Sequence, residues 1–219
     1  MKAVLAFIIS QSILFPIIIG FVRFRTIKTD YQPLFWSLVF GFLAEIISFN
    51  LIHFYHAGNT VPTNIFVLGQ WLLLCYQFQV WGFLRKQKGS LLILTIVPVL
   101  VWFSENIFFG KIGVFSPYFR LLYAFLITLM SITEINFCIT HDHSNLLKNP
   151  TFILCIGLIL FFVYQMLYEW SYQMSIMHEP SQFTQMINAS FAYINALTNI
   201  IFGIAFLVIP GKNQYRFEI

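Results

Sequence analysis

FWSLVFGFLAEIISFNLIHFYH, residues Phe35 to His56, decides the fold of this chain, because it is an apolar run of bilayer length with Glu45 at its middle. At about 1.5 Å per residue the run extends about 33 Å, which matches a hydrocarbon core roughly 30 Å thick. An ionised carboxylate at that depth costs at least about 2.5 kcal/mol on insertion scales. We therefore expect Glu45 to face the interior of a helix bundle, where it can be paired or protonated.

The composition of the whole chain is that of an integral membrane protein. Of 219 residues, 59% are hydrophobic and only 9% are charged, whereas a soluble domain has about 25% charged residues. The net charge of +4 does not indicate nucleic-acid binding here, because the basic residues gather at the ends of apolar runs, where they orient a membrane protein. No polar interval is long enough for a second domain, so residues 1–219 are expected to form one membrane domain in the lipid bilayer.

Seven apolar runs have the length of a membrane-spanning helix, which predicts an all-α, polytopic bundle of seven transmembrane helices. The runs cover roughly residues 3–22, 34–55, 62–84, 91–109, 117–139, 151–173 and 186–209. Alternate connections and the tail contain Arg23, Arg25, Lys28, Arg85, Lys86, Lys88, Lys148, Lys212 and Arg216, whereas the other side has only Lys2 and Lys111. The positive-inside rule then predicts the amino terminus outside and the carboxyl terminus in the cytoplasm of a bacterial inner membrane.

Polar side chains recur at helical spacing inside these runs, mostly toward the predicted outer side. Unpaired polar groups in lipid cost several kcal/mol, so the stripes are expected to converge on a polar pocket open to the outside. A single amide more often only joins two helices by a hydrogen bond. The candidate ligand-binding residues are Glu45, His53, Gln70, Glu105, Arg120, Tyr123, Glu169, Asn188 and Asn195.

The charged candidates have distinct expected roles. Glu45 is the protonatable centre of the pocket. Arg120 is the one cation within a run, and Glu105 or Glu169 is its expected partner at the same depth. Such a pair would bind an anionic or zwitterionic group, which Gln70, Asn188 and Asn195 would orient.

Metal binding and catalysis are not expected. His53 and His56 lie three residues apart, with His178 predicted on the same side, but the chain has no HExxH or HxxxH pair. These histidines are therefore only weak metal candidates, and no cofactor is expected. We identify no nucleophile with a positioned base, so we assign no catalytic residue. Three cysteines lie in apolar runs without CxxC spacing, as small core residues do: Cys75, Cys138 and Cys155.

Five segments follow one another along the chain: LAEIISF (Leu43–Phe49), NIFVLGQWLLL (Asn64–Leu74), PYFRLLYAFLITLMSITEI (Pro117–Ile135), NPTF (Asn149–Phe152) and INALTNIIFGIAF (Ile194–Phe206). In this order they resemble a family of small, uncharacterised heptahelical membrane proteins frequent in Bacteroidota. Members of that family often have a glutamate in the helix where this chain has Gln70. The group has no established activity, so the resemblance implies the fold and a bacterial source but no function.

These observations lead to the hypothesis of a membrane-embedded receptor or sensor. A small molecule would bind in the outward-facing pocket, and a cytoplasmic or membrane protein would receive the signal. Two alternatives stay open. A proton-coupled small-solute transporter would commonly have inverted repeats or broken helices, which we do not recognise in the sequence. A structural or accessory subunit of a larger membrane complex would point its polar stripes outward, toward a neighbour.

Overall fold

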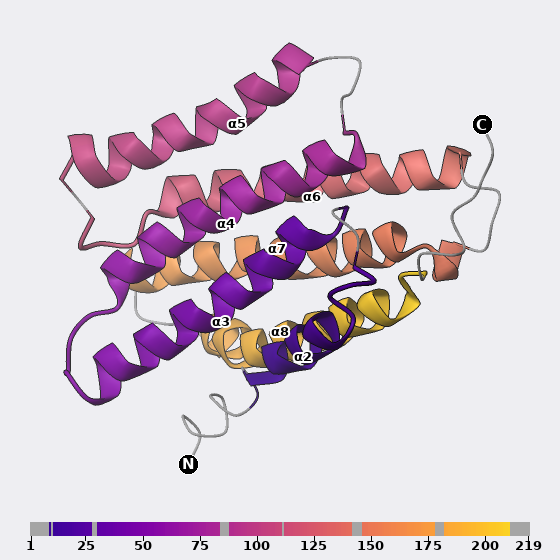
Figure 1. The fold of residues 1–219 in the computed structure, drawn as a ribbon. Helices are drawn as coiled ribbons and strands as arrows, with labels where there is room; N and C mark the ends of the chain where they lie inside the picture. Colours follow the sequence, from indigo (N-terminus) through magenta and orange to yellow (C-terminus); the bar gives the residue numbers. More distant parts are fainter. Residues whose placement is uncertain are drawn as a thin grey trace.

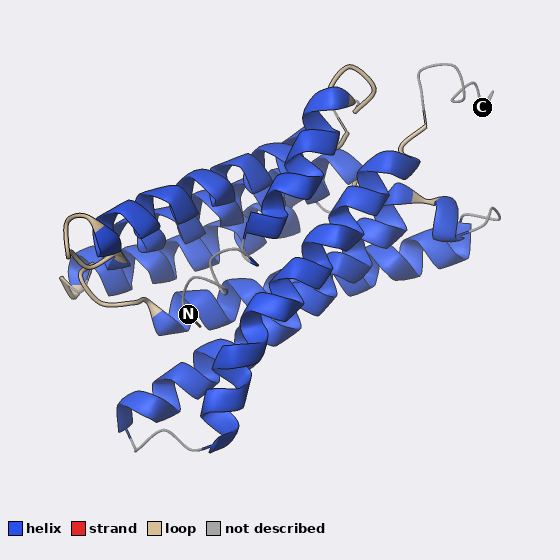
Figure 2. Ribbon diagram, turned by 90° about the horizontal axis from the view of Figure 1, so that it is seen from below, coloured by secondary structure: helices blue, strands red, loops and turns tan. Residues whose placement is uncertain are grey.

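The computed structural model is a bundle of α-helices (Figure 1). It describes residues 9, 11–27, 30–83, 88–110, 112–141, 146–177 and 182–210. Within these ranges the helices are α2 (Leu14–Val22), α3 (Gln32–His53), α4 (Thr60–Trp81), α5 (Lys88–Phe103), α6 (Pro117–His141), α7 (Pro150–Met177) and α8 (Gln182–Val208). Short 3₁₀ turns at Gln11–Ile13 and Leu146–Lys148 and a π-helical segment at Ser104–Phe108 complete the helical structure. Figure 2 shows that the parts of the chain placed by the structure are helices and loops, without a strand.

Six of the seven predicted apolar runs coincide with a helix whose ends differ by a few residues. The first run, 3–22, is helical over Gln11–Val22, and most of its beginning lies outside the described residues. Four helices, α3, α6, α7 and α8, are long and apolar enough to cross a membrane. The apolar segments Gln11–Val22 and Leu92–Phe108 are shorter. α4 has 22 residues, but its asparagine and glutamines make it less apolar than those four. That all seven helices cross the membrane remains a prediction from the sequence, and so does their orientation.

Local sequence explains where several helices begin and end. Prolines stand in the first turn of α3, α6 and α7, where a missing backbone N–H costs least: Pro33, Pro117 and Pro150. The side chain of Gln77 on α4 accepts a hydrogen bond from the Leu34 amide at 2.9 Å and donates to the Asp30 carbonyl at 2.5 Å, which caps the start of α3. Gly82 follows α4 with a φ of 94°, the left-handed conformation that suits glycine at a helix end.

The helices are arranged as a closed circuit. α2 packs on α3, α3 on α4, α4 on α6, α6 on α7, α7 on α8, and α8 returns to α2. α5 packs on α4 and α6 and lies at the edge of the bundle (Figure 1). The largest fully buried side chains are aromatic, among them Trp71, Tyr123, Phe35, Phe78 and Phe206. These aromatic side chains form the core of the bundle.

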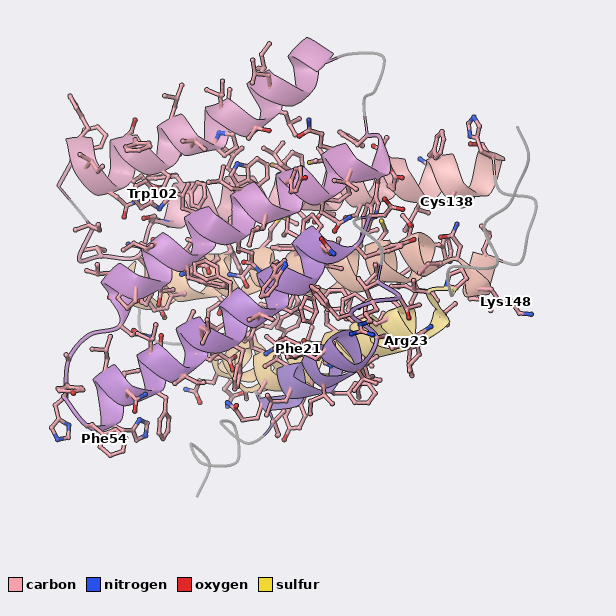
Figure 3. All side chains as sticks on the ribbon, in the orientation of Figure 1. Phe21, Arg23, Phe54, Trp102, Cys138 and Lys148 are labelled. Carbon is pink, nitrogen blue, oxygen red and sulfur yellow. The ribbon has the colours of Figure 1, made fainter. Side chains whose placement is uncertain are left out.

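Arg23 joins the beginning of the circuit to its end. It follows α2, and its guanidinium donates hydrogen bonds to the carbonyls of Phe206 at 2.7 Å, Ile209 at 2.7 Å and Leu207. The last carbonyls of a helix have no partner within the helix, and a cation there also complements the helix dipole. Figure 3 shows Arg23 beside the end of α8. Arg23 thus caps α8 and holds it against α2.

Candidate functional site

A cavity of about 210 Å³ lies within the circuit, lined by Ile13 and by residues of α3, α4, α6, α7 and α8. Its polar lining is Ser37, Glu45, Thr63, Gln70, Arg120, Tyr123, Gln165, Asn195, Thr198 and Asn199. Five phenylalanines contribute to the rest of the wall: Phe66, Phe161, Phe162, Phe191 and Phe202. The cavity therefore combines charged and amide groups with aromatic rings.

Helical periodicity explains which side chains reach the cavity. On α3, Ser37, Gly41 and Glu45 follow one another at intervals of four residues, so they share one face. Intervals of four, three and four residues put Thr63, Val67, Gln70 and Leu74 of α4 on the cavity side. On α8 the series is Phe191, Asn195, Thr198 and Phe202. Each of the three helices contributes both polar and small or apolar side chains, so the wall of the cavity is mixed.

Glu45 lies on the interior side of α3 and is half-buried. One turn before it stands Gly41, and a Cβ atom at Gly41 would lie 3.5 Å from Cζ of the Phe66 ring. The same Cβ atom would lie 3.4 Å from Cδ1 of Ile13, so Ile13 and Phe66 form the wall one turn before Glu45.

Arg120 and Glu169 form a buried ion pair between α6 and α7. The Arg120 Nε and Nη2 atoms lie 2.6 Å and 2.5 Å from Oε1 of Glu169, and Nε2 of Gln165 donates to the same oxygen at 2.8 Å. Glu169 is 2% exposed. The guanidinium carbon also lies 5.3 Å from the centre of the Phe115 ring. Of the two expected partners, Glu169 is the one that neutralises Arg120.

Glu105 has a different role. Its carboxylate accepts hydrogen bonds from the backbone amides of Tyr118 at 3.2 Å and Phe119 at 2.8 Å, in the first turn of α6. A carboxylate at a helix amino terminus satisfies free N–H groups and complements the helix dipole. Glu105 therefore caps α6, and it is outside the cavity lining.

Two buried donor atoms of the lining have no hydrogen-bond partner among the residues that the structure describes: Nη1 of Arg120 and Oγ1 of Thr198. An unsatisfied buried donor costs about 1–3 kcal/mol, and more when it is charged. Native proteins normally satisfy such atoms with protein groups, water or a ligand. These two atoms therefore favour an occupant with hydrogen-bond acceptors.

The amide and phenol groups of the lining are partly connected to one another. The Tyr123 hydroxyl lies 3.4 Å from Oε1 of Gln70, a long hydrogen bond. Nδ2 of Asn199 donates to Oγ of Ser12 at 2.9 Å and lies 3.4 Å from Oδ1 of Asn195. These contacts orient Gln70 and Asn195 at the cavity wall.

The cavity brings together only part of the predicted set. Glu45, Gln70, Arg120, Tyr123 and Asn195 line it, and Glu169 supports Arg120 from behind. Asn188 is exposed on α8, although it lies two turns before Asn195 on the same face. The cavity wall on α8 begins only at Phe191, so the stripe continues past the cavity.

The predicted histidines also lie outside the cavity lining. His53 is exposed at the end of α3, and its ring stacks on Phe49 with centroids 4.2 Å apart. His56 is exposed as well, and His178 is outside the described residues. Within the described ranges, no group of three or more histidine, cysteine, aspartate or glutamate side chains could hold a metal ion.

Several lining residues were not among the predicted candidates. Gln165 could have been found, because it lies four residues before Glu169 on the same helix face. Asn199 belongs to the same polar stripe as Asn195. The phenylalanines of the wall carry no recognisable signal, because the chain has 27 phenylalanines and most face other surfaces.

Comparisons with protein-family models, curated proteins and solved structures return no match for this chain. The resemblance to the small heptahelical family of Bacteroidota therefore stays a prediction from the sequence, and the geometry of the cavity is the basis for the function proposed below.

Proposed function

We propose that the protein is a membrane-embedded binding protein of the receptor or sensor type, which receives a small ligand in its central cavity. The observation that carries this proposal is the unpartnered Nη1 donor of Arg120, a nine-tenths buried side chain of the cavity wall. A structural ion pair alone would not require a cavity beside it. A ligand acceptor in the cavity would satisfy this donor.

The size of the cavity limits the ligand. An apolar protein cavity of about 150 Å³ accepts benzene, so a cavity of about 210 Å³ accepts a molecule somewhat larger than benzene. The ligand is therefore of metabolite size. A peptide or a whole lipid would have to leave most of its volume outside.

In this proposal all seven helices cross the bacterial inner membrane, with the amino terminus outside. The positive-inside rule supports this orientation. Arg23 and Lys148 lie at one end of the bundle and Phe54 and Trp102 at the other (Figure 3). The cavity also supports ligand binding over a purely structural role, because polar stripes of five helices face inward.

The conformational change caused by ligand binding would reach a protein partner through the contact of α6 with α7. The Arg120–Glu169 pair joins these helices at the cavity wall. A ligand that binds more tightly to one arrangement of α6 and α7 shifts the bundle toward that arrangement. A cytoplasmic or membrane protein that contacts the ends of these helices would detect the change.

Native mass spectrometry of the purified protein tests the proposal with a matched pair of variants. Gly41→Leu adds a side chain at the cavity wall, whereas Gly58→Leu adds the same side chain where no atom lies within 4 Å of the new Cβ. We expect a retained small molecule in the wild type and in Gly58→Leu but not in Gly41→Leu. Equal retention of the molecule in both variants contradicts ligand binding in the cavity. If the wild type retains no molecule, its melting temperature is measured with a panel of metabolites, and the absence of any stabilising metabolite contradicts the proposal as well.

A further inference from the structure

The ion pair at the cavity wall limits the charge of the ligand. Arg120 and Glu169 neutralise each other, because Nε and Nη2 of the guanidinium both contact Oε1 of Glu169. An anion bound at Nη1 would therefore lose its hydration beside a pair that has no net charge, which is unfavourable. Glu45, the carboxyl group of the lining, has an interaction of its own within the chain, so it does not by itself require a cationic ligand. These contacts favour an uncharged ligand.

The two unpartnered donors of the wall require acceptor atoms in the ligand. Nη1 of Arg120 belongs to α6 and Oγ1 of Thr198 to α8, and both atoms are buried without a hydrogen-bond partner among the residues placed by the structure. Thr198 is 1% exposed. α7 packs on both of these helices, so the two donors approach the cavity from either side of α7. A ligand that satisfies both donors needs two acceptors.

The packing of α8 on α7 gives the separation of the two donors along the bundle. Phe202 of α8 packs at Gly157 of α7, where an added Cβ atom would lie 2.7 Å from Cε1 of the phenylalanine ring. The two helices are antiparallel, so Thr198, four residues before Phe202, lies level with Phe161, four residues after Gly157. Glu169, which binds Arg120, lies eight residues further along α7, about 12 Å at about 1.5 Å per residue. A hydrogen bond of about 3 Å at each end leaves about 6 Å between the two acceptors.

Aromatic side chains of α6, α7 and α8 meet at the same part of the cavity. Phe161 and Phe162 line it with ring centres 5.1 Å apart, and the Phe162 ring centre lies 5.4 Å from that of Tyr123. On the other side, the ring centres of Phe161 and Phe191 are 6.1 Å apart. Aromatic rings gain from edge-to-face or offset contact with a further ring, beyond the burial of its surface. A flat ring therefore suits this space, and oxygens at opposite positions of a six-membered ring have about the required separation.

We propose that the cavity binds an uncharged, conjugated six-membered ring with oxygen acceptors at opposite positions, one toward Arg120 and the other toward Thr198. Such a ring with small substituents is somewhat larger than benzene, as the cavity of about 210 Å³ requires. Free para-hydroxyaryl ketones have this chemistry, and so do the headgroups of membrane quinones. The assignment rests on the proposed binding function and names the ligand class of the same site.

Isothermal titration of the full-length wild type in phosphatidylglycerol nanodiscs tests the ligand class with four compounds. Para-hydroxyacetophenone is uncharged and has both oxygens. Para-hydroxybenzoate has a similar shape but is an anion at about pH 6, where carboxylates are ionised and phenols are neutral. Para-ethylphenol lacks the carbonyl group, and para-acetylcyclohexanol lacks the aromatic ring.

We expect para-hydroxyacetophenone to bind about tenfold or more tightly than para-hydroxybenzoate and para-ethylphenol, because the first carries a charge and the second leaves one donor unsatisfied. It should bind about threefold more tightly than para-acetylcyclohexanol, which makes no ring–ring contacts. Equal or tighter binding of any of these three compounds overturns the assignment.

Two threonine variants test the position of the second oxygen. Thr198→Val keeps the shape of the side chain and should weaken para-hydroxyacetophenone binding about fivefold or more. It should leave para-ethylphenol binding unchanged, because a single oxygen is expected at the charged donor of Arg120. Thr128→Val removes a hydroxyl that bonds to the Ala124 carbonyl outside the cavity lining, and it should leave both affinities as in the wild type. An unchanged para-hydroxyacetophenone affinity in Thr198→Val contradicts the proposal, and the wild-type compound series decides the question if that variant does not fold.

Two further results separate the possible failures and sources. If no ring compound binds but the wild type retains a small molecule that Gly41→Leu loses, the binding function stands and the ligand class is wrong. If the ring comes from a membrane quinone, nanodiscs that contain a long-chain isoprenoid quinone should weaken the apparent affinity for para-hydroxyacetophenone by competition. If it comes from a free solute, nanodiscs with and without the quinone should give the same affinity.

Discussion

Arg120 on α6 and Glu169 on α7 are bound to each other through a single carboxylate oxygen, 2.6 Å from Nε and 2.5 Å from Nη2 of the guanidinium. This geometry uses the Nε–Nη2 edge of the guanidinium for the ion pair and leaves Nη1 without a partner among the described residues. The ion pair thus fixes α6 against α7 while one donor remains for an occupant of the cavity. The predictions below follow from this contact and from the contacts that hold the circuit of helices together.

The ion pair should behave as a unit. Glu169→Gln or Arg120→Met should lower the free energy of unfolding by about 3–5 kcal/mol, because each leaves a buried charge without its partner. The double variant Arg120→Met with Glu169→Met should be more stable than either single variant, since no charge is left buried. Thermal unfolding in detergent measures the difference. A double variant that loses the sum of the two single effects would show that the two side chains act independently.

The buried amide of Asn64 should hold the segment before α6 in place. Its Nδ2 atom donates to Oδ1 of Asn106 at 3.0 Å and to the carbonyls of Ile112 at 3.1 Å and Val114 at 2.8 Å. Asn64→Ala should cost about 1–3 kcal/mol and speed hydrogen exchange at residues 112–116. Asn50→Ala is the control, because the Asn50 side chain donates to the Ile46 carbonyl within its own helix. Unchanged hydrogen exchange at residues 112–116 in Asn64→Ala would contradict the proposal that Asn64 anchors this segment.

Arg23 should hold the end of α8. Arg23→Ala removes the hydrogen bonds to the Phe206, Leu207 and Ile209 carbonyls. A hydrogen bond from a charged donor contributes about 1.5–3 kcal/mol to the free energy of unfolding. We expect faster hydrogen exchange over residues 205–210 and a lower melting temperature. Arg25→Ala removes an exposed cation of the same turn and should change neither. Equal effects of both variants would indicate a general loss of charge rather than a lost cap.

Cysteine labelling tests the predicted orientation. Gly58 and Lys148 lie in connections at opposite ends of the helices, and the positive-inside rule predicts Gly58 outside and Lys148 inside. In a background in which the buried Cys75, Cys138 and Cys155 are alanine, an impermeant maleimide should label Gly58→Cys in intact cells. It should label Lys148→Cys only after the membrane is opened. The reverse pattern would invert the topology.

The sequence predicted the helices well because the apolar runs are long and are separated by polar turns. It also predicted that Glu45 faces inward, since a carboxylate avoids lipid, and that Arg120 needs an acidic partner. Depth alone could not choose between Glu105 and Glu169. Only the folded chain shows that Glu105 stands at the amino terminus of α6, where two backbone amides compete for it.

The cavity itself could be predicted only in part. Periodicity predicts which residues share a face of a helix, but it does not predict where along that face the cavity ends. Asn188 and Asn195 lie on the same face, so the sequence could not show that only Asn195 lines the cavity. The packing of α8 on α2 and the selection of a few phenylalanines for the wall depend on contacts between distant segments. Hydropathy does not distinguish a phenylalanine at the cavity from one at the lipid.

An experimental density map of the purified wild-type protein, by electron microscopy or crystallography, tests the central claim most directly. The account predicts compact density that the chain does not explain, between Glu45 and Arg120 and within hydrogen-bond distance of the Arg120 Nη1 atom. A map in which phenylalanine side chains close this space, or in which the Glu45 carboxyl lies on the lipid-facing side of α3, would contradict it.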